Sequence, residues 1–392
     1  MLRILLFATL TLHFATATIA QVPSGTAISD PPSDTSKVGF PDRIVGGRLS
    51  PTVDLRAVDG ISLGIAYKIS SKAYEKEHPG SFQKIKALRS LFTKSMVVEY
   101  GANFKEVFKK TDLSIKVLAD MQGNIMNFFG PGNDTEFNET GDFRKYYRVN
   151  FSYYEFKPAL RFNLTDEVSI TTGPSIQHFV NGRNEGRYFS TPAINSSYND
   201  IYGDKLHGGL SLDFTWDRRD DQILPTRGTN FNIILLGFEG LNSSSQSFTQ
   251  AFSQFSFFQS LDANGTIVLA NRFGGGFTSG NPAFYQSAFL GSEGNLLGFR
   301  KNRFAGDHVL YNNLEARITV PNFLQKIMPG KMGLIGAYDA GRVWVNNETS
   351  STIHHSLSAG VFLTPFNKLF VRATAGFSNE RIQPTVAFRQ RF

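Results

Sequence analysis

Cysteine is absent from this chain of 392 residues. Its absence excludes disulfides and lipid attachment at a cysteine, two covalent supports of exported proteins. Long hydrophobic runs are also missing, because nothing beyond the signal-like N-terminus reaches the roughly 18 continuous apolar residues of a membrane-spanning helix. Strong charge is missing too. The formal net charge of +7 fits contact with anionic lipid headgroups, and we expect no nucleic-acid partner.

The N-terminal region differs in composition from everything that follows. Arg3 provides a positive start, an apolar stretch comes next, and small residues end it at Ala20, so we predict a signal peptide at 1–20. The following segment is rich in proline, serine, glycine and aspartate, without any period. We expect 21–59 to be a mostly flexible periplasmic leader and 60–392 to be the folded domain.

From about residue 60 onward the sequence alternates between apolar and polar residues. In the segment SLGIAYKIS, the apolar side chains on one face are Leu63, Ile65, Tyr67 and Ile69. Small polar residues fill the other face, and the same pattern recurs in LSLDFTWD and LFVRATAGF. A soluble β-sandwich also alternates, but its exposed face would carry more charge. The pattern therefore predicts an all-β protein, a transmembrane antiparallel β-barrel.

About sixteen segments of this kind follow one another, two of them centred near residues 148 and 160, and an even number returns the chain to its starting side. We therefore expect a barrel in the outer membrane of a Gram-negative bacterium, with both barrel termini in the periplasm. The long connections near 71–82, 179–204, 279–307 and 342–353 are then expected outside the cell.

The chain ends on an aromatic residue, Phe392, which shares one face of the last expected strand with Phe388. A terminal aromatic after an alternating strand is similar to the signal by which outer-membrane barrels are recognised for insertion. We therefore assign Phe388 and Phe392 to a C-terminal insertion signal.

A glycine-rich basic segment interrupts the alternation at 289–307. The sequence LGSEGNLLGFRKNRFAGDHVLYNNLEARI contains a Gly-Phe pair at Gly298 and Phe299. The next two strands carry an Asn-x-Glu-x-Arg pattern and an Asp-x-Gly pattern, formed by Asn313, Glu315, Arg317, Asp339 and Gly341. These motifs, in this order, resemble the bacterial surface antigen barrels of the BamA/TamA-type outer-membrane superfamily.

The resemblance implies that this extracellular loop folds into the barrel lumen. Members of the family place an arginine before the Gly-Phe pair, where this chain has Leu297. We hypothesise that Arg300 or Arg303 makes the lumenal contact with Glu315 and Asp339 instead, through charge-assisted hydrogen bonds. The leader has no room for POTRA modules, so we expect a short member of the family.

The resemblance also implies a scaffold or gated pore that inserts or translocates protein or lipid. Its expected partners are outer-membrane lipid, the barrel-assembly machinery during insertion, and periplasmic or outer-membrane proteins. A passive diffusion channel is one alternative, and an outer-membrane enzyme is another. The one Gly-x-Ser-x-Gly match, around Ser62, opens a strand rather than a nucleophile elbow. The neighbouring His354 and His355 point to opposite faces of a strand. We expect no catalytic residue, no metal site and no cofactor.

Overall fold

The computed structural model describes residues 44–392, apart from gaps at 57–59, 72–79, 94, 122–123, 183, 193, 195–199, 293, 323–324 and 347. The predicted signal peptide and the first part of the predicted leader lie outside the described residues. Antiparallel strands form most of the remainder. The strands are β1 (Ile44–Arg56), β2 (Gly60–Ser71), β3 (Ser81–Ser90), β4 (Met96–Phe108), β5 (Thr111–Met121), β6 (Asn124–Asn127), β7 (Arg148–Asn163), β8 (Val168–Asn181), β9 (Lys205–Asp217), β10 (Gly228–Gly240), β11 (Phe248–Ser260), β12 (Ile267–Gly280), β13 (Ala288–Leu290), β14 (Phe304–Gly306), β15 (His308–Val320), β16 (Met332–Trp344), β17 (His354–Leu363), β18 (Val371–Phe377) and β19 (Ile382–Ala387).

Helical structure is confined to single turns. They are α2 (Phe143–Tyr146), η2 (Tyr188–Ser190), η3 (Phe284–Gln286) and η4 (Pro365–Asn367). In the described part of the chain, no helix has the length and apolar character needed to cross a membrane.

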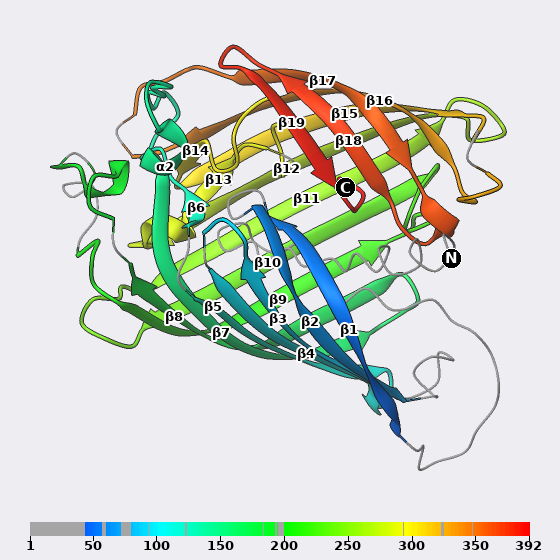
Figure 1. Cartoon of the computed structure of the whole chain (residues 1–392), viewed down its shortest axis with the longest axis horizontal. Coiled ribbons are helices and arrows are strands. Elements are labelled where there is room, and N and C mark those ends of the chain that lie inside the picture. Colours follow the sequence, from blue (N-terminus) through cyan, green and yellow to red (C-terminus); the bar gives the residue numbers. More distant parts are fainter. Residues whose placement is uncertain are drawn as a thin grey trace.

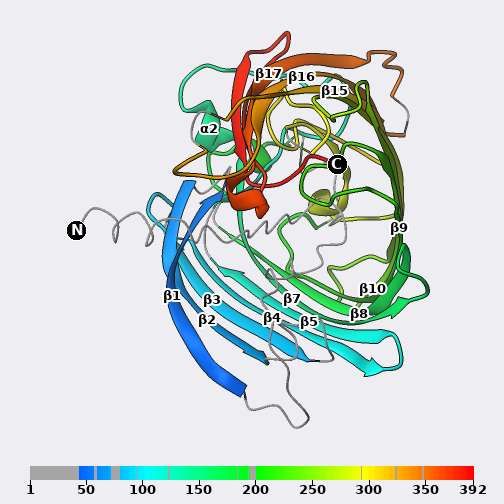
Figure 2. The same cartoon turned by 90° about the vertical axis from the view of Figure 1, so that its right-hand side faces the viewer.

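One sheet of 17 strands forms the wall, and its strands pair antiparallel in chain order, except that β5 pairs with β7 and β12 pairs with β15. Figure 2 shows this sheet curled into a cylinder, with β1 and the C-terminal strands at its two edges. No ladder pairs β1 with β19 among the described residues. Strands β5 and β6 both pair with β7, so the 17 strands occupy sixteen positions in the wall.

Side chains alternate between the two faces of the wall, as the sequence pattern predicts. On β2, Leu63 and Ile65 are exposed on the outer face, whereas Ser62 and Ala66 are buried on the lumenal face. The outer face is the apolar one, which suits lipid, and the lumenal face carries small and polar residues. The prediction of an all-β transmembrane antiparallel barrel with about sixteen strands is confirmed.

The sheet begins sixteen residues earlier than the expected boundary at residue 60. β1 pairs with β2 along its length, after a register shift between Val45 and Arg48. A glycine pair at this shift and Pro51 within the strand weaken its alternation, which is why the sequence pattern missed it. Proline is tolerated on an edge strand, because its missing N–H needs no ladder partner there. The expectation that 21–59 lies entirely outside the barrel is therefore wrong for β1.

A second difference compensates for the first. The sequence pattern indicated two strands centred near residues 148 and 160, but they form the single 16-residue strand β7. The number of strands in the wall therefore equals the number expected from the sequence. Each connection before β7, however, lies at the opposite end of the barrel from the end expected. The connection 128–147 therefore lies at the same end as 182–204, 281–307 and 345–353, which we call the loop end (left in Figure 1). The connection between β2 and β3 lies at the opposite end, the turn end.

The pairing of β1 with β2 predicts a specific disulfide in this cysteine-free chain. Val53 lies directly opposite Leu63. Opposed residues of an antiparallel pair have Cα atoms about 4.5–5.5 Å apart, within the Cα range of disulfides. We expect the double variant V53C/L63C to form an intramolecular disulfide in folded protein, detected by mass spectrometry after mild oxidation.

The matched control is V53C/I65C, because Ile65 lies opposite Pro51 and is displaced by two residues from Val53. Equal disulfide yields in the two variants, or none in either, would contradict the register of β1.

Candidate functional site

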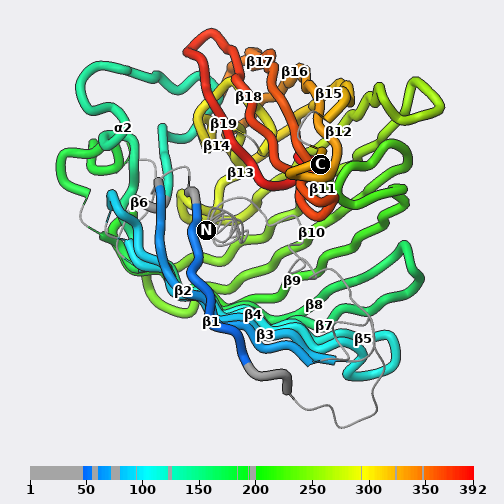
Figure 3. The backbone as a smooth tube through the Cα atoms, turned by 45° about the vertical axis from the view of Figure 1, so that its right-hand side comes forward, coloured from blue at the N-terminus to red at the C-terminus, as the bar shows by residue number. Residues whose placement is uncertain are grey.

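The connection between β12 and β15 folds back inside the wall. Its hairpin, β13 and β14, pairs from Ala288 opposite Gly306 to Leu290 opposite Phe304. Every residue of both strands is buried, and Figures 1 and 3 show the hairpin within the curled sheet. The inward-folded loop expected from the sequence is present.

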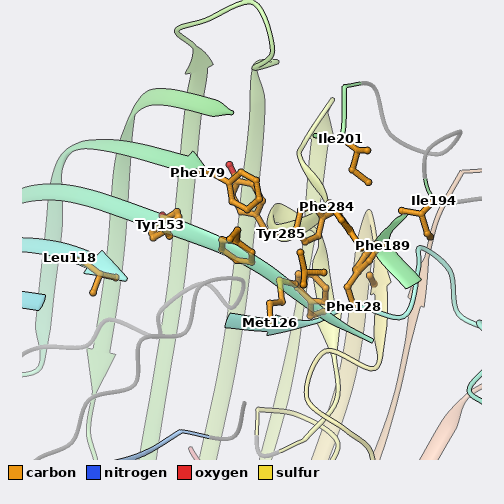
Figure 4. Packing of buried hydrophobic residues seen from close by; sticks show 14 of the residues in the cluster. Leu118, Met126, Phe128, Tyr153, Phe179, Phe189, Ile194, Ile201, Phe284 and Tyr285 are labelled. Carbon is orange, nitrogen blue, oxygen red and sulfur yellow. The ribbon is translucent and has the colours of Figure 1, made fainter. Parts of the chain in front are cut away.

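Two apolar clusters hold this loop against the wall. Phe284 and Tyr285 of η3 enter the first cluster, where Tyr285 stacks on Phe179 with ring centroids 4.6 Å apart and Phe284 lies 5.1 Å from Phe128 (Figure 4). The second cluster consists of Ala288, Leu290, Leu296, Phe299, Phe304, Val309 and Val343. Because burying each large apolar side chain contributes roughly 1.5–3 kcal/mol, these clusters hold most of the loop in place.

A fully buried carboxylate, Asp339 on β16, receives the tip of the loop. Its Oδ2 accepts a hydrogen bond from the backbone N–H of Leu297 at 2.9 Å and from Ser356 Oγ at 3.3 Å. Its Oδ1 accepts one from Asn313 Nδ2 at 2.9 Å. A buried charge is costly without a partner of opposite sign, so this site also needs a cation.

The cation comes from the C-terminus. Nη1 of Arg391 lies 2.7 Å from Oδ1 of Asp339, and Nη2 donates to Oδ2 at 2.7 Å, with both side chains fully buried. The Nη2 contact is a charge-assisted hydrogen bond, which is stronger than a neutral one, and Nη1 adds a close ion contact. The arginine that the family places before the Gly-Phe pair is Leu297 here, and the guanidinium contacting Asp339 belongs to another part of the chain.

Residues 388–392, the C-terminal tail, turn into the lumen beyond β19. The ring of Phe392 stacks on Phe258 of β11 at 6.1 Å. Arg272 of β12 lies over the Phe392 ring at 5.0 Å, and its Nη1 donates to the backbone oxygen of Arg391 at 3.0 Å. The tail is therefore held by β11, β12 and β16 together.

This tail changes the expected placement of the terminal aromatics. Phe392 does not continue the alternation of β19, because the strand ends five residues earlier and the ring faces Phe258 in the lumen. Phe388 lies directly after the strand and is partly buried. The role of Phe388 and Phe392 as an insertion signal stays a prediction.

Arg272 and Asn313 join the wall to the loop behind the tail. Arg272 donates to Asn313 Oδ1 from Nε at 3.0 Å and from Nη2 at 2.6 Å, and its Nη2 also donates to the backbone oxygen of Gly294. Asn313 Nδ2 donates to the backbone oxygen of Asn295 at 2.7 Å. The sequence analysis did not identify Arg272. Its position in an alternating strand next to the loop could have indicated a lumenal contact.

Arg303 lies at the loop end of the barrel. Its Nε donates to Glu380 Oε1 and its Nη1 to Thr135 Oγ1, both at 2.6 Å, and its guanidinium lies over the Phe304 ring at 4.6 Å. Burial lowers the pKa of Arg303, while the Glu380 carboxylate opposes that shift. Burial also raises the pKa of Glu380, although Arg303 lowers it. The pair clamps the loop to the turn between β18 and β19.

Arg300 lies near Arg303 at the loop end and contacts aromatic rings. Its guanidinium lies 4.8 Å from the ring centroid of Phe143 and 5.6 Å from that of Phe137. Burial and the neighbouring Arg381 and Arg144 lower the pKa of Arg300 to about 10.

The hypothesis that Arg300 or Arg303 reaches Glu315 and Asp339 is therefore wrong; among the described residues, Arg391 makes the Asp339 contact. The physical reason is chain direction. After Phe299 the loop reverses into β14, which runs antiparallel to β13, and this return carries both arginines to the loop end.

Glu315 and Arg317 are buried on the lumenal face of β15, as expected. Arg317 Nε lies 3.6 Å from Glu315 Oε1, and Arg317 Nη2 donates to the backbone oxygen of Pro225 at 2.7 Å. This pair therefore anchors the connection 218–227 at the turn end instead of the loop.

Two motif glycines permit close contact between loop and wall. A Cβ on Gly298 would lie 2.6 Å from Ser356 Cβ and 2.8 Å from the backbone oxygen of Phe377. A Cβ on Gly341 would lie 2.9 Å from Leu290 Cδ1 of β13. At Gly298 the neighbours are backbone and Cβ atoms, so only glycine allows the loop to approach the wall this closely, whereas at Gly341 a small shift of the Leu290 side chain would relieve the closest contact.

The segment after β6 crosses the loop end and covers the hairpin. The backbone N–H of Gly132 donates to the backbone oxygen of Ala305, within β14, at 2.8 Å. The fully buried Asn133 side chain accepts from the Val343 N–H at 3.0 Å and donates to the backbone oxygen of Thr352 at 2.9 Å. These bonds connect the first half of the wall to β16 and β17.

The two adjacent histidines lie on opposite faces of β17. His354 stacks on Phe304 at 3.8 Å and lies edge-on to Phe299 at 5.6 Å, which fixes the motif phenylalanine in the second cluster. His355 contacts the exposed Tyr338 on the outer face. Over the described ranges, no group of three or more histidine, aspartate or glutamate side chains is arranged to hold a metal ion.

The wall and its inward loop define an outer-membrane β-barrel of the kind that carries a lumenal loop. The family model of the Omp85 superfamily domain matches residues 103–367, more than half of the chain. The chain belongs to the Omp85 superfamily, which confirms the resemblance read from the loop motifs.

Solved structures agree on the fold. BamA from Haemophilus ducreyi, in a form lacking POTRA domains 1–3, is similar over 88% of this chain and 70% of that chain, with a TM-score of 0.65 and 16% identity. CdiB from Escherichia coli is similar over 88% of this chain, with a TM-score of 0.54 and 11% identity, and the matched part is 61% of that CdiB chain. No curated protein is significantly similar in sequence.

The buried pair predicts a large effect of one C-terminal substitution. In the variant R391A, Asp339 keeps its burial and loses its cation, and breaking a buried ion pair from one side costs about 3–5 kcal/mol. We expect the barrel to lose its heat-modifiable mobility on gels at a clearly lower temperature, and external protease to cleave the loop faster.

The matched control is R381A, because Arg381 forms only a partly exposed pair with Glu139 at 3.4 Å, worth about 0–1 kcal/mol. The double variant D339N/R391A should be less unstable than the sum of its single variants, since the two residues interact. If R391A and R381A changed the unfolding temperature and the rate of loop cleavage equally, the proposed contribution of the Asp339–Arg391 pair to stability would be contradicted.

Proposed function

We propose that this barrel is a membrane-embedded scaffold that helps insert or translocate proteins at the outer membrane, together with partner proteins. In this proposal the loop end faces outward and both termini of the barrel face the periplasm. Omp85 barrels of this kind act in insertion or translocation and are not known as enzymes. One observation carries the proposal for this chain: among the residues that the structure describes, no ladder joins the two edges of its wall.

The edges matter because the barrel lies in lipid. β1 offers 13 residues of strand and β19 only six, and no ladder joins them among the described residues. Each unsatisfied backbone N–H or C=O in hydrocarbon costs several kcal/mol. A strand of an incoming polypeptide would satisfy these groups by adding to the edge, as in β-augmentation.

The lumenal contents favour a scaffold over a passive diffusion channel. The loop hairpin is buried between two apolar clusters, and the C-terminal tail fills the space beside β11, β12 and β16. A channel selected for diffusion would leave this part of its lumen to water. A gated conduit fits better, because the loop and tail would have to move before large cargo passes.

Photo-crosslinking during reconstituted insertion tests the proposal. A photoreactive amino acid replaces Val53 on β1 or Val386 on β19, both exposed on the outer face near the seam. The variants are placed in liposomes and given an unfolded outer-membrane β-barrel polypeptide. We expect adducts with that polypeptide at both positions while it folds.

The control position is Leu235 on β10, which is equally exposed to lipid but lies in the continuous part of the wall. Adducts should be several-fold weaker there. Equal adducts at all three positions, or steady ion conductance with no adducts at the seam, would favour the passive channel.

A further inference from the structure

A row of basic side chains crosses the wall at one level. Members on adjacent strands are direct ladder partners. On β4 the corresponding position in the row is Gly101. We call these residues the basic row: Arg48, Lys68, Lys84, Lys116 and Lys157, on β1, β2, β3, β5 and β7. Neither the loop motifs nor the proposed insertion role accounts for it.

The basic row faces the lumen. Adjacent residues of a strand point to opposite faces, and the sequence neighbours of the row are exposed on the lipid face. These outward neighbours are Leu49, Tyr67, Ile85, Val117 and Phe156. They are ladder partners of one another, except that Tyr100 on β4 lies between Ile85 and Val117, so the apolar row and the basic row run parallel on the two sides of the wall.

The arrangement is unfavourable for the empty barrel. Lys68 lies directly opposite both Arg48 and Lys84, and Lys116 lies directly opposite Lys157. Like charges opposed across strands destabilise a sheet. With strands about 4.8 Å apart, the row extends over roughly 25 Å of the lumenal wall. A cationic line of this length attracts anions into the lumen.

Nearby carboxylates neutralise only part of the row. Glu155 pairs with Lys116 at 2.9 Å, while Glu99 pairs with Lys86, one level away, at 2.8 Å. Lys84 and Lys157 lie within 4 Å of no carboxylate that the structure describes, but Glu99 and Asp54 attract Lys84, and Glu155 and Asp213 attract Lys157 over longer distances. These four carboxylates face the five members of the row and Lys86. Excess positive charge therefore remains on both sides of Gly101, where no side chain separates Lys84 from Lys116.

The row also lies apart from the site around Asp339. The tail and the loop tip contact β11, β12 and β15–β18, and η3 of the loop packs on β7 and β8 near their loop-end halves. The basic row instead crosses β1–β7, drawn in blue to green in Figure 3, at a level closer to the turn end. Lys68 lies three residues before the end of β2, and Lys84 three residues after the start of β3. Both positions are near the turn end, away from the loop end.

We propose that the basic row binds an anion that carries several phosphate charges, either a phosphorylated lipid headgroup or a free polyphosphate. Lysine ammonium groups are compact point charges and common phosphate ligands. Four of the five members are lysines, placed along a line that matches an extended polyanion. The inference is independent of the proposed insertion function, because it needs neither the seam nor movement of the loop.

Calorimetric titration of purified barrel in uncharged detergent tests this site with two probes. Inorganic tripolyphosphate represents the free source, and dihexanoyl phosphatidic acid represents the lipid headgroup. We expect at least one probe to bind at low salt, with affinity that falls tenfold or more in K84Q/K157Q. Preference for one probe then identifies the source of the phosphate.

The matched control is K109Q/K110Q, which removes the same charge from the exposed turn between β4 and β5. It should bind like the unaltered protein. Equal affinity in K84Q/K157Q and the unaltered protein would overturn the proposal, as would equal binding of an octaglutamate peptide, which carries charge without phosphate.

Thermal stability distinguishes a binding site from a structural role. Removing opposed like charges should raise the unfolding temperature of K84Q/K157Q without ligand. Tripolyphosphate should raise that of the unaltered protein and leave the double variant unchanged. A lower unfolding temperature for K84Q/K157Q, together with unchanged probe binding, would show that the lysines are structural.

Discussion

The fold of the lumen depends on one buried carboxylate. Asp339 is fully buried and receives hydrogen bonds from the loop tip at Leu297, from β15 and from β17, and its charge is balanced by Arg391. Because an unpaired carboxylate there would be costly, these partners must be present together. The positions of the loop, of three wall strands and of the C-terminus are thus tied together by the need to compensate one buried charge. The apolar clusters alone would not fix these positions relative to one another.

The alternation of apolar and polar residues was sufficient to predict most strands of the wall. The loop motifs were sufficient to predict about half of the residues of the site. Alternation revealed the strands, but it failed at β1, where a bulge and Pro51 blur the period, and at β7, where one long strand was read as two. The motifs identified Asp339 and Gly298 as contact points. They could not identify Arg391, because its pairing with Asp339 joins residues 52 apart through the path of the tail. A displaced arginine near Gly298 was the more obvious candidate, and only the reversal into β14 excludes it.

The lumen has two chemically different sides. Beside β11–β18 it is filled by aromatic and aliphatic loop residues around a neutralised ion pair. Across from it, toward the turn end, β1–β7 present opposed basic side chains that are only partly neutralised. A single curled sheet supports both because its lumenal positions alternate with outward positions along every strand, so lipid-facing residues stay apolar whatever the lumen carries.

The tail connects the lumenal site to the seam of the wall. If residues 388–392 continued β19 at about 3.3 Å per residue, they would lengthen that strand by about 17 Å along the edge facing β1. The same residues cannot also place Arg391 against Asp339 and Phe392 against Phe258. Pinning of the loop and extension of the last strand therefore compete for one short segment. Release of Arg391 would remove the cation beside the loop tip and leave the tail available to lengthen β19, so chain connectivity links the site around Asp339 to the seam.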